Sequence, residues 1–419
     1  MAQKKKFYHM NKDERLAFLR NLADLSESET KLLADPCSGI NFEMSNRMIE
    51  NAIGTMPLPL GVATGFLING KDYVVPMATE EPSIIAACSK AAKIARSSGG
   101  FRAYADKPIM IGQVQLVSVA FPDAGLKVIS NKPKLISIAN NYSRTVKATD
   151  INVKWIDDQV ASGAGKMLIV EILVDTKDAM GANAINTMCE AISSELERIT
   201  DGEAVVKVLS NYTTRRLVRC NAIFRKEDLG GERIVDRILY SYSFAYSDVY
   251  RAVTNNKGVM NGIDALAVAT GQDFRAIEAA AHAYASRDGT YRSITTWKKT
   301  NDGDLLGELE IPIAVGIVGG VTNVNPLVMI GLKILGVKSS SDLAMIISAV
   351  GLAQNLSAIL ALATVGIQKG HMKLHARNIA ISAGAQGNLV DIIASRMIRE
   401  GNIRSSRAKE IILSMTGHE

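Results

Sequence analysis

Residues 166–199 read KMLIVEILVDTKDAMGANAINTMCEAISSELERI and carry the strongest local pattern in the chain. The mostly apolar run from Lys166 to Val174 predicts a buried strand, and the helical spacing of apolar residues from Asn183 to Ile199 predicts a helix. They are joined by DAMGAN at 178–183, a turn of small and polar residues. The segment is therefore a strand followed directly by a helix.

The flanking residues extend this pattern in both directions. Periodicity predicts a strand at Ile109–Val119, a helix at Pro133–Ser143, a strand at Ile151–Ile156 and, after the quoted segment, a strand at Ala204–Leu209. The order β-α-β-β-α-β is typical of the ferredoxin-like arrangement, an antiparallel sheet with helices on one face. We expect residues 108–215 to form an inserted small domain.

The rest of the chain is mainly helical in pattern. Residues 11–34 predict an amphipathic helical arm with Asn11 or Ser26 as a cap, and Ser45–Gly54 predicts a helix that ends at its glycine. Pro82 suits the first turn of a further helix, which would place Glu81 at that helix's N-terminus.

Two hairpins interrupt the helices. Gly65–Met77 turns at Asn69-Gly70, and Tyr291–Thr300 and Leu305–Ile313 flank Asn301-Asp302-Gly303. The expected fold class is α+β, with a large, mainly helical domain built from residues 1–107 and 216–370. Residues 371–419, basic and helical in pattern, form a separate C-terminal unit in this interpretation.

Composition limits the possible functions. The chain has 419 residues and a mass of 45.1 kDa, which is more than a single hydrophobic core usually contains, so two or three domains are expected. The net charge of +6 is dispersed apart from Lys4-Lys5-Lys6, and no aromatic-and-basic signature accompanies it, which disfavours nucleic acid binding.

The four cysteines show no CxxC spacing and no signal peptide is recognised, which indicates reduced thiols and a cytoplasmic location. Leu343–Ile367 contains Gln354, Asn355 and Ser357, so we expect a buried core helix and no membrane span.

Common catalytic motifs are missing, since no GxGxxG follows a strand and no GxxxxGK[ST], HExxH or GxSxG occurs. DAMGAN could place backbone amides against a pyrophosphate, although a capped strand-to-helix turn explains it equally well.

Lys257, within RAVTNNKGVMN at 251–261, could stabilise an oxyanion or be a solvated loop lysine. His371 and His375 share a helix face, but without a third ligand nearby we expect no metal. His371 could therefore be a proton donor, or it could be an ordinary core or surface histidine.

Taken together, these segments resemble class II 3-hydroxy-3-methylglutaryl-coenzyme A (HMG-CoA) reductases along nearly the whole chain. Seven motifs in order carry the resemblance: ENAIG at 50–54, EEPS at 80–83, DAMGAN at 178–183, NKGVMNG at 256–262, GQD at 271–273, GLAQN at 351–355 and GHMKLHARN at 370–378. The HARN extension and the lack of an N-terminal membrane anchor fit class II rather than class I.

The resemblance implies roles for individual residues. The matched catalytic set is Glu81, Lys257, Asp273 and His371. The positions that match the family's hydroxymethylglutaryl site are Ser83, Arg251, Asn261 and Gln354. The positions that match its dinucleotide site are Ser143, Arg144, Asp178, Met180, Gly181, Asn183 and Asn211. A buried Lys257 held by Asp273 would stabilise the oxyanion, His371 would protonate the thiolate, and Glu81 would be the acid of the second reduction.

The resemblance also implies the reaction: four-electron reduction of (S)-HMG-CoA to mevalonate and coenzyme A by two NAD(P)H. NADH-preferring relatives carry an acidic residue on the first helix of the small domain, where this chain has Ser143 followed by Arg144. Since serine and arginine can bind a 2′-phosphate that an acid would repel, NADPH is expected over NADH.

The family further implies a homodimer or higher homo-oligomer with the active sites at the interface, and a C-terminal flap over residues 371–419 that closes on the site. The small domain would be the nicotinamide-binding domain. Mevalonate synthesis for isoprenoids and NAD-dependent mevalonate catabolism by the reverse reaction both remain open. Two rival readings, another acyl-CoA oxidoreductase and an RNA-binding ferredoxin-like module, leave the coexistence of the four catalytic residues unexplained.

Overall fold

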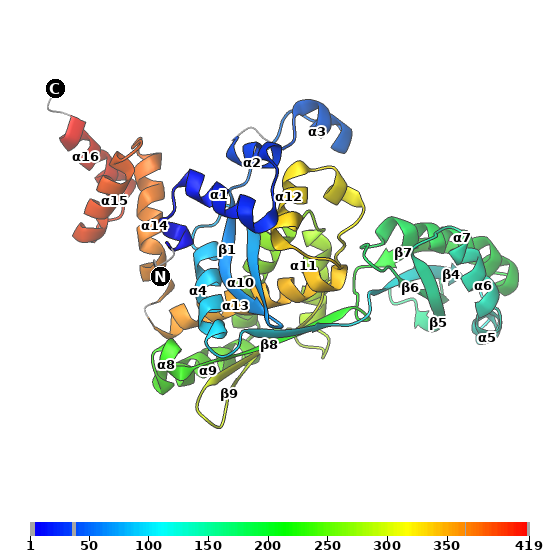
Figure 1. Ribbon diagram of the computed structural model, residues 1–419. Coiled ribbons are helices and arrows are strands. Elements are labelled where there is room, and N and C mark those ends of the chain that lie inside the picture. The colour runs from blue at the N-terminus through cyan, green and yellow to red at the C-terminus, as the bar shows by residue number, and fades with distance from the viewer. Residues whose placement is uncertain (1–4, 36–38, 365, 417–419) are drawn as a thin grey trace.

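The computed structural model describes residues 5–35, 39–364 and 366–416, apart from the side chains of 321, 323, 367–374 and 416. Figure 1 shows a large central domain, a small domain joined to it at one side, and a helical unit at the C-terminal end. The α+β fold expected from the sequence is confirmed, because helices pack on two separate sheets.

The small domain has the strand order of a ferredoxin-like sheet. Its four strands are β4 (Ile109–Val117), β5 (Lys147–Asp157), β6 (Lys166–Asp175) and β7 (Glu203–Ser210), and they pair antiparallel in the order β5-β6-β4-β7. Leu168, Val170 and Ile172 of β6 are fully buried at every second position, so one face of the sheet forms the core.

The helices on this sheet are α5 (Asp123–Ser130), α6 (Lys132–Asn140) and α7 (Ala182–Thr200). The predicted β-α-β-β-α-β order is confirmed with shifted boundaries. Helix α5 was not predicted, because Phe121-Pro122-Asp123 reads as a turn. The helix predicted to reach Ser143 ends at Asn140, so Ser143 lies in the following turn.

The large domain contains a six-stranded sheet that the sequence indicated only in part. Its strands are β1 (Leu60–Ile68), β2 (Lys71–Ala78), β3 (Phe101–Ala105), β8 (Leu217–Phe224), β9 (Thr295–Lys299) and β10 (Leu305–Pro312). They are arranged in the order β2-β1-β3-β8-β10-β9. Both predicted hairpins, β1–β2 and β9–β10, are confirmed.

Helices α4 (Ile84–Arg96), α10 (Val249–Ala269) and α13 (Ser340–Ala363) pack against this sheet. Most of α13 is buried, including Asn355 at 0% exposed. It is the one helix, among the residues that the structure describes, that is long and apolar enough to cross a membrane, and its most apolar window is 83% buried. The predicted buried core helix is therefore confirmed.

Further helices surround this framework: η1 (Phe7–His9), α1 (Lys12–Ala23), α2 (Glu27–Ala34), α3 (Phe42–Met48), α8 (Lys226–Leu229), α9 (Glu232–Ser247), α11 (Phe274–Ala285), η2 (Gly320–Asn323) and α12 (Pro326–Leu335). Asn11 and Ser26 both form capping boxes, so the predicted arm is two capped helices. The helix predicted at Ser45–Gly54 is wrong in its bounds, since α3 ends at Met48 and Glu50–Gly54 is irregular.

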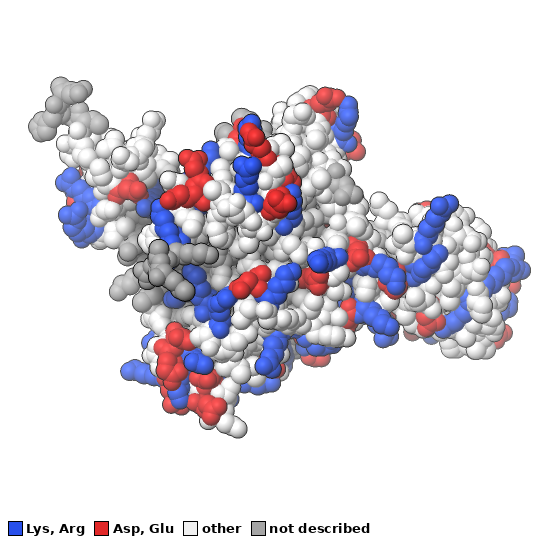
Figure 2. Space-filling view, viewed as in Figure 1, with Lys and Arg blue, Asp and Glu red and all other residues white. Residues whose placement is uncertain are grey.

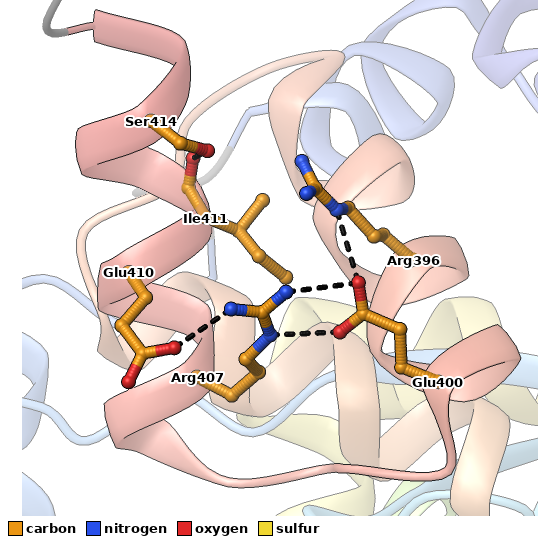
Figure 3. A network of polar contacts seen from close by, with 6 residues as sticks. All are labelled: Arg396, Glu400, Arg407, Glu410, Ile411 and Ser414. Carbon is orange, nitrogen blue, oxygen red and sulfur yellow. Dashed lines mark hydrogen bonds and ion pairs between the residues drawn. The ribbon is translucent and has the colours of Figure 1, made fainter.

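The C-terminal unit consists of α14 (Ile367–Ser382), α15 (Leu389–Glu400) and α16 (Ser405–Thr416), with its own small core around Ala376, Ile393 and Met397. Arg407 of α16 donates to both carboxylate oxygens of Glu400, at 2.7 and 3.0 Å, and to Glu410 (Figure 3). Arg407 therefore joins the last two helices of the unit.

Charge and thiol chemistry agree with the sequence interpretation. On the face in Figure 2, basic and acidic side chains are interspersed over both domains. Cys88, Cys189 and Cys220 are buried and free, and burial raises the pKa of the Cys189 and Cys220 thiols to about 12. The fourth cysteine, Cys37, lies outside the described residues.

Candidate active site

The candidate site centres on an ion pair between two elements far apart in sequence. Nζ of Lys257, in the middle of α10, lies 2.8 Å from Oε2 of Glu81, which precedes α4. The Lys257 side chain is 60% exposed and that of Glu81 is 37% exposed. An ammonium group next to a carboxyl group, both open to a ligand, can stabilise a developing oxyanion and supply a proton.

Glu81 is held by an unusual entry into α4. Ser83 is the N-cap of this helix and adopts a left-handed conformation with φ +78°, without a side-chain capping hydrogen bond. The sequence pattern predicted Pro82 in the first turn of this helix. In the structure, Pro82 precedes the helix. A non-glycine residue with positive φ is strained, and such strain concentrates at functional sites.

Helix α10 lies very close to α13 because glycines face the contact. A Cβ on Gly262 would lie 2.9 Å from Cβ of Gln354 and 3.2 Å from the carbonyl oxygen of Val350. Gln354 is 5% exposed, and its Oε1 has no hydrogen-bond partner within the described part of the chain. A buried amide oxygen without a partner is costly, so it marks a place where a polar ligand group would be favourable.

Two further residues expected at the substrate are also on α10. Asn261 lies one turn after Lys257, on the same face of the helix. Arg251 lies in the first turn, and burial lowers the pKa of its guanidinium; no ion pair to it is found among the described residues. A partly desolvated and unpaired arginine is suited to bind a carboxylate.

A cavity of about 930 Å³ adjoins Glu81 and Ser83. Its lining includes four basic side chains, Lys6, Arg15, Lys90 and Lys93. The sequence interpretation did not find these residues. Spacing could have revealed two of them, since Ala86, Ser89, Lys90 and Lys93 form one stripe of α4 beginning just after Glu81.

The DAMGAN segment forms a second cluster, near the C-terminal end of α10. Asp178 accepts a hydrogen bond from the backbone N–H of Ser340 at 2.8 Å, and its carbonyl accepts from Ile317 N at 2.9 Å. A Cβ on Gly316 would lie 2.5 Å from the backbone nitrogen of Met180. Gly316 N in turn donates to Oε1 of Gln272, the neighbour of Asp273, at 2.9 Å.

The turn leaves the N-terminus of α7 uncapped. Gly181 is the N-cap with φ +93° and gives no side-chain capping bond, so the turn is not closed by an Asn183 side-chain cap. A Cβ at Gly181 would lie 2.4 Å from Cγ2 of Thr176, which together with the positive φ makes glycine necessary here. Free amides at a helix N-terminus suit a phosphate group.

Arg216, which sequence reasoning missed, fixes this cluster to the large domain. It is 3% exposed and donates to Thr176 Oγ1, to Ala179 O and to Val315 O. Burial lowers its pKa to about 10, while the carboxylates of Asp178 and Asp175 act in the opposite direction. A lone arginine at the end of an apparent linker gave no sequence signal for this role.

The expected contact between Lys257 and Asp273 is wrong within one chain. Lys257 is exposed rather than buried, and it pairs with Glu81. Asp273 accepts from Ala276 N at 3.1 Å as the N-cap of α11 and lies 3.3 Å from Arg275. The part of α10 from Lys257 to its end at Ala269, about 18 Å of helix, separates the two groups.

The remaining predicted cofactor residues are at the surface of the small domain. Ser143 Oγ accepts from Val146 N at 3.1 Å, while Arg144, Asn183 and Asn211 are exposed. His371 belongs to α14, but its side chain lies outside the described residues. The structure thus brings Glu81 and Lys257 together, and it gathers the DAMGAN turn near Asp273 at a second location.

Solved structures match this architecture over nearly its whole length. A class II HMG-CoA reductase of Streptococcus pneumoniae, determined bound to NADPH, is 39% identical with a TM-score of 0.80, covering 97% of this chain and 100% of that one. Another structure of the enzyme from S. pneumoniae is 38% identical with a TM-score of 0.81, covering 98% and 99%. The fold is therefore that of the class II HMG-CoA reductases, which are oxidoreductases.

Sequence comparison gives the family. The hydroxymethylglutaryl-coenzyme A reductase family matches residues 11–376. The HMG-CoA reductase of Archaeoglobus fulgidus is 49% identical over 408 residues, which is 97% of this chain and 93% of that protein. A probable HMG-CoA reductase of Borreliella burgdorferi is 33% identical over 96% of this chain and 92% of that protein. The chain belongs to the HMG-CoA reductase family, and its resemblance to class II members is confirmed.

Proposed function

We propose that this chain reduces (S)-HMG-CoA to mevalonate and coenzyme A in two steps, with two NADPH, in the cytoplasm and in the direction of isoprenoid synthesis. The observation that carries the proposal is the Glu81–Lys257 pair at 2.8 Å beside a large basic cavity. The pair supplies both an electrophilic cation and an acid, which are the groups that reduction of a thioester carbonyl requires.

Each residue of the pair has a distinct task in the proposed reaction. NADPH supplies one hydride to the carbonyl carbon in each reduction. Lys257 stabilises the negative charge that develops on the carbonyl oxygen, and Glu81 gives a proton to the alkoxide of the second reduction. His371 protonates the departing thiolate of coenzyme A, for which an imidazole that titrates near neutral pH is suited.

The substrate is bound by groups on both sides of the pair. Arg251 binds the free carboxylate of the hydroxymethylglutaryl group, and Ser83, Asn261 and Gln354 bind its hydroxyl and carbonyl oxygens. The unpartnered Oε1 of Gln354 supports this assignment. The phosphates of coenzyme A bind at Lys6, Arg15, Lys90 and Lys93, whose shared cavity reaches Glu81.

The dinucleotide binds at the small domain, with its pyrophosphate at the N-terminus of α7. Asp178, Met180, Gly181, Asn183 and Asn211 surround it, and Ser143 and Arg144 bind the 2′-phosphate. The uncapped amides of α7 support the pyrophosphate position. The domain division follows from this assignment: 1–107 with 216–370 for the substrate, 108–215 for the dinucleotide, and 371–419 as a flap that carries His371.

The active protein is proposed to be a homodimer or a higher homo-oligomer. DAMGAN and Asp273 lie at one end of α10, whereas Glu81 lies with Lys257 farther along it, so one chain does not bring dinucleotide and substrate together. A second copy would place its Asp273 and dinucleotide against the first copy's Glu81 and Lys257. Exposed apolar side chains support such an interface, since Ile53 is 99%, Met56 88% and Tyr250 88% exposed.

The test follows absorbance of NADPH as HMG-CoA is added, together with release of free thiol. We expect two NADPH consumed for each coenzyme A released. Lys257→Ala should lower kcat at least a hundredfold, because it removes the cation at the oxyanion. Lys298→Ala is the matched control, since Lys298 is also 60% exposed and paired with a glutamate, Glu308. Full activity of Lys257→Ala, or one NADPH per thiol, would contradict the proposal.

A further inference from the structure

A chain of four titratable side chains lies behind α10 and is not used by the proposed reaction. Asp264 of α10 lies near Glu278 of α11, and burial together with the Glu278 carboxyl raises the pKa of Asp264. Oε2 of Glu278 lies 2.6 Å from Nε2 of His282, and Nδ1 of His282 lies 2.6 Å from the hydroxyl of Tyr291. The His282 and Tyr291 rings are stacked, with centroids 5.8 Å apart.

The chain ends at the residue before Lys257. Tyr291 begins the 291–294 loop, two residues of which bind the side chain of Asn256, and Asn256 itself is 1% exposed. Asn256 Nδ2 donates to Arg292 O at 2.8 Å, and its Oδ1 accepts from Ile294 N at 3.0 Å. Asn256 therefore ties the turn of α10 that carries Lys257 to the 291–294 loop.

Neighbouring contacts show how firmly this turn is held. Asn255 Nδ2 donates to Ser293 Oγ at 2.9 Å, and Asn355 Nδ2 donates to the Asn255 side chain at 3.1 Å. The two residues before Lys257 are thus both fixed through buried amides, although the Lys257 side chain itself is exposed. The orientation of Lys257 depends on packing behind the helix rather than on groups around its ammonium.

The two carboxyl groups cannot both be charged at low cost. Oδ1 of Asp264 is buried without a hydrogen-bond partner among the described residues. Burial, and then Glu278, raise the pKa of Asp264 to about 8. Helices α4, α9, α12 and α13 and strand β2 also pack on α10, and among the described residues none of theirs forms an ion pair or hydrogen bond with the Asp264 carboxyl. One proton is therefore held between Asp264 and Glu278 at neutral pH.

We propose that Asp264 and Glu278 share a proton and, together with His282 and Tyr291, act as positioning residues that hold Lys257 in place through Asn256. This inference rests on the proposed role of Lys257. The network locks α10 against α11 and the 291–294 loop only while one of the two carboxyls is protonated. Its loss would displace the ammonium from the oxyanion without removing any group that touches the substrate.

The sign of the pH dependence follows from the shared proton. The folded state keeps the Asp264 proton up to about pH 8, whereas an unfolded aspartate loses its proton near pH 4. This group's contribution to the free energy of unfolding is present below about pH 4 and is lost as pH rises toward 8. Asparagine mimics the protonated carboxyl and should remove that dependence.

The first experiment compares Asp264→Asn with wild type in thermal unfolding from pH 5 to pH 9. We expect the midpoint of wild type to fall relative to that of Asp264→Asn across this range. The matched control is Asp288→Asn, since Asp288 is exposed and outside the network, and it should follow wild type. Parallel curves for wild type and Asp264→Asn would overturn the shared proton.

The second experiment measures steady-state kinetics at pH 7 and pH 9. Tyr291→Phe breaks the chain between His282 and Asn256, and kcat should fall on the order of tenfold with KM for HMG-CoA unchanged. Asp264→Asn should keep its kcat at pH 9 while that of wild type declines. A rise in KM without a fall in kcat, or the same alkaline decline in both proteins, would overturn the positioning role. Unfolding does not depend on catalysis, so failure of the Lys257 assignment would appear separately, as activity retained in Lys257→Ala.

Discussion

At the level of single residues, we propose that the segment after α6 determines cofactor choice. Arg144 is exposed there, and Ser143 uses its hydroxyl to accept from Val146 N at 3.1 Å. Neither side chain carries negative charge, so the turn does not repel a phosphate. In the proposed binding mode, the Arg144 guanidinium would add a charge-assisted hydrogen bond to a 2′-phosphate, worth about 1.5–3 kcal/mol.

The prediction is a change of selectivity in the double variant Ser143→Asp with Arg144→Ala. The ratio of kcat/KM for NADPH over NADH should fall on the order of 10- to 100-fold, because the phosphate loses a cation and meets an anion. Arg198→Ala is the control, since Arg198 lies on the same domain but pairs with Glu195, and it should leave the ratio unchanged. A wild type that turns over NADH as well as NADPH would contradict the assignment.

Sequence was most informative where chemistry needs one residue type at one position. Gly181 could be anticipated from DAMGAN because only glycine combines positive φ with the close approach to Thr176. Arg216 could not, because its partners Thr176, Ala179 and Val315 come from distant segments. The stripe of Lys90 and Lys93 was readable by spacing, but charge on a helix face is commonly only a solvated surface.

At the scale of elements, the packing of α10 on α13 determines where Lys257 and Gln354 lie. The helices approach closely because Gly262 has no side chain at the contact. A methyl group added there would meet Gln354 Cβ at 2.9 Å and the Val350 carbonyl oxygen at 3.2 Å. Backbone does not yield as a flexible side chain does, so the helices would have to separate.

Gly262→Ala should therefore destabilise the protein by about 1–3 kcal/mol despite alanine's better helix propensity. Gly258→Ala is a matched control one turn earlier, because its nearest neighbour would be Ala358 Cβ at an ordinary 3.6 Å. That variant should be neutral or stabilised by up to about 1 kcal/mol. Denaturant unfolding of both variants measures the difference, and equal free energies of unfolding would show that the contact is not tight.

Element boundaries were predictable where periodicity or capping was strong and failed elsewhere. The capping boxes at Asn11 and Ser26 and the turn at Asn69-Gly70 are local signals, and the structure confirms them. Strands β3 and β8 were not predicted, because β3 is only five residues long and both owe their pairing to partners far away in sequence. The large sheet was consequently seen only as two hairpins.

At the scale of the whole molecule, the candidate site is divided. Figure 1 shows the small domain with α7 at one side of the large domain, and α4, which follows Glu81, toward the other. The four motifs that hold Glu81, Lys257, Asp273 and the dinucleotide turn were all recognisable in sequence. The division of these motifs into two clusters could not be recognised in sequence. It arises because α10 carries Lys257 in its middle, whereas Asp273 follows its end.

We propose that Glu81 and Lys257 of one subunit work with Asp273 and the dinucleotide of another subunit. Mixed dimers purified through two different tags test it directly. A dimer of Lys257→Ala with Asp273→Asn should have one intact site in two, and therefore about half of wild-type activity. A dimer of wild type with a subunit carrying both substitutions should be inactive, because each of its sites lacks one residue. The opposite pattern, an inactive first dimer and a half-active second, would contradict the account.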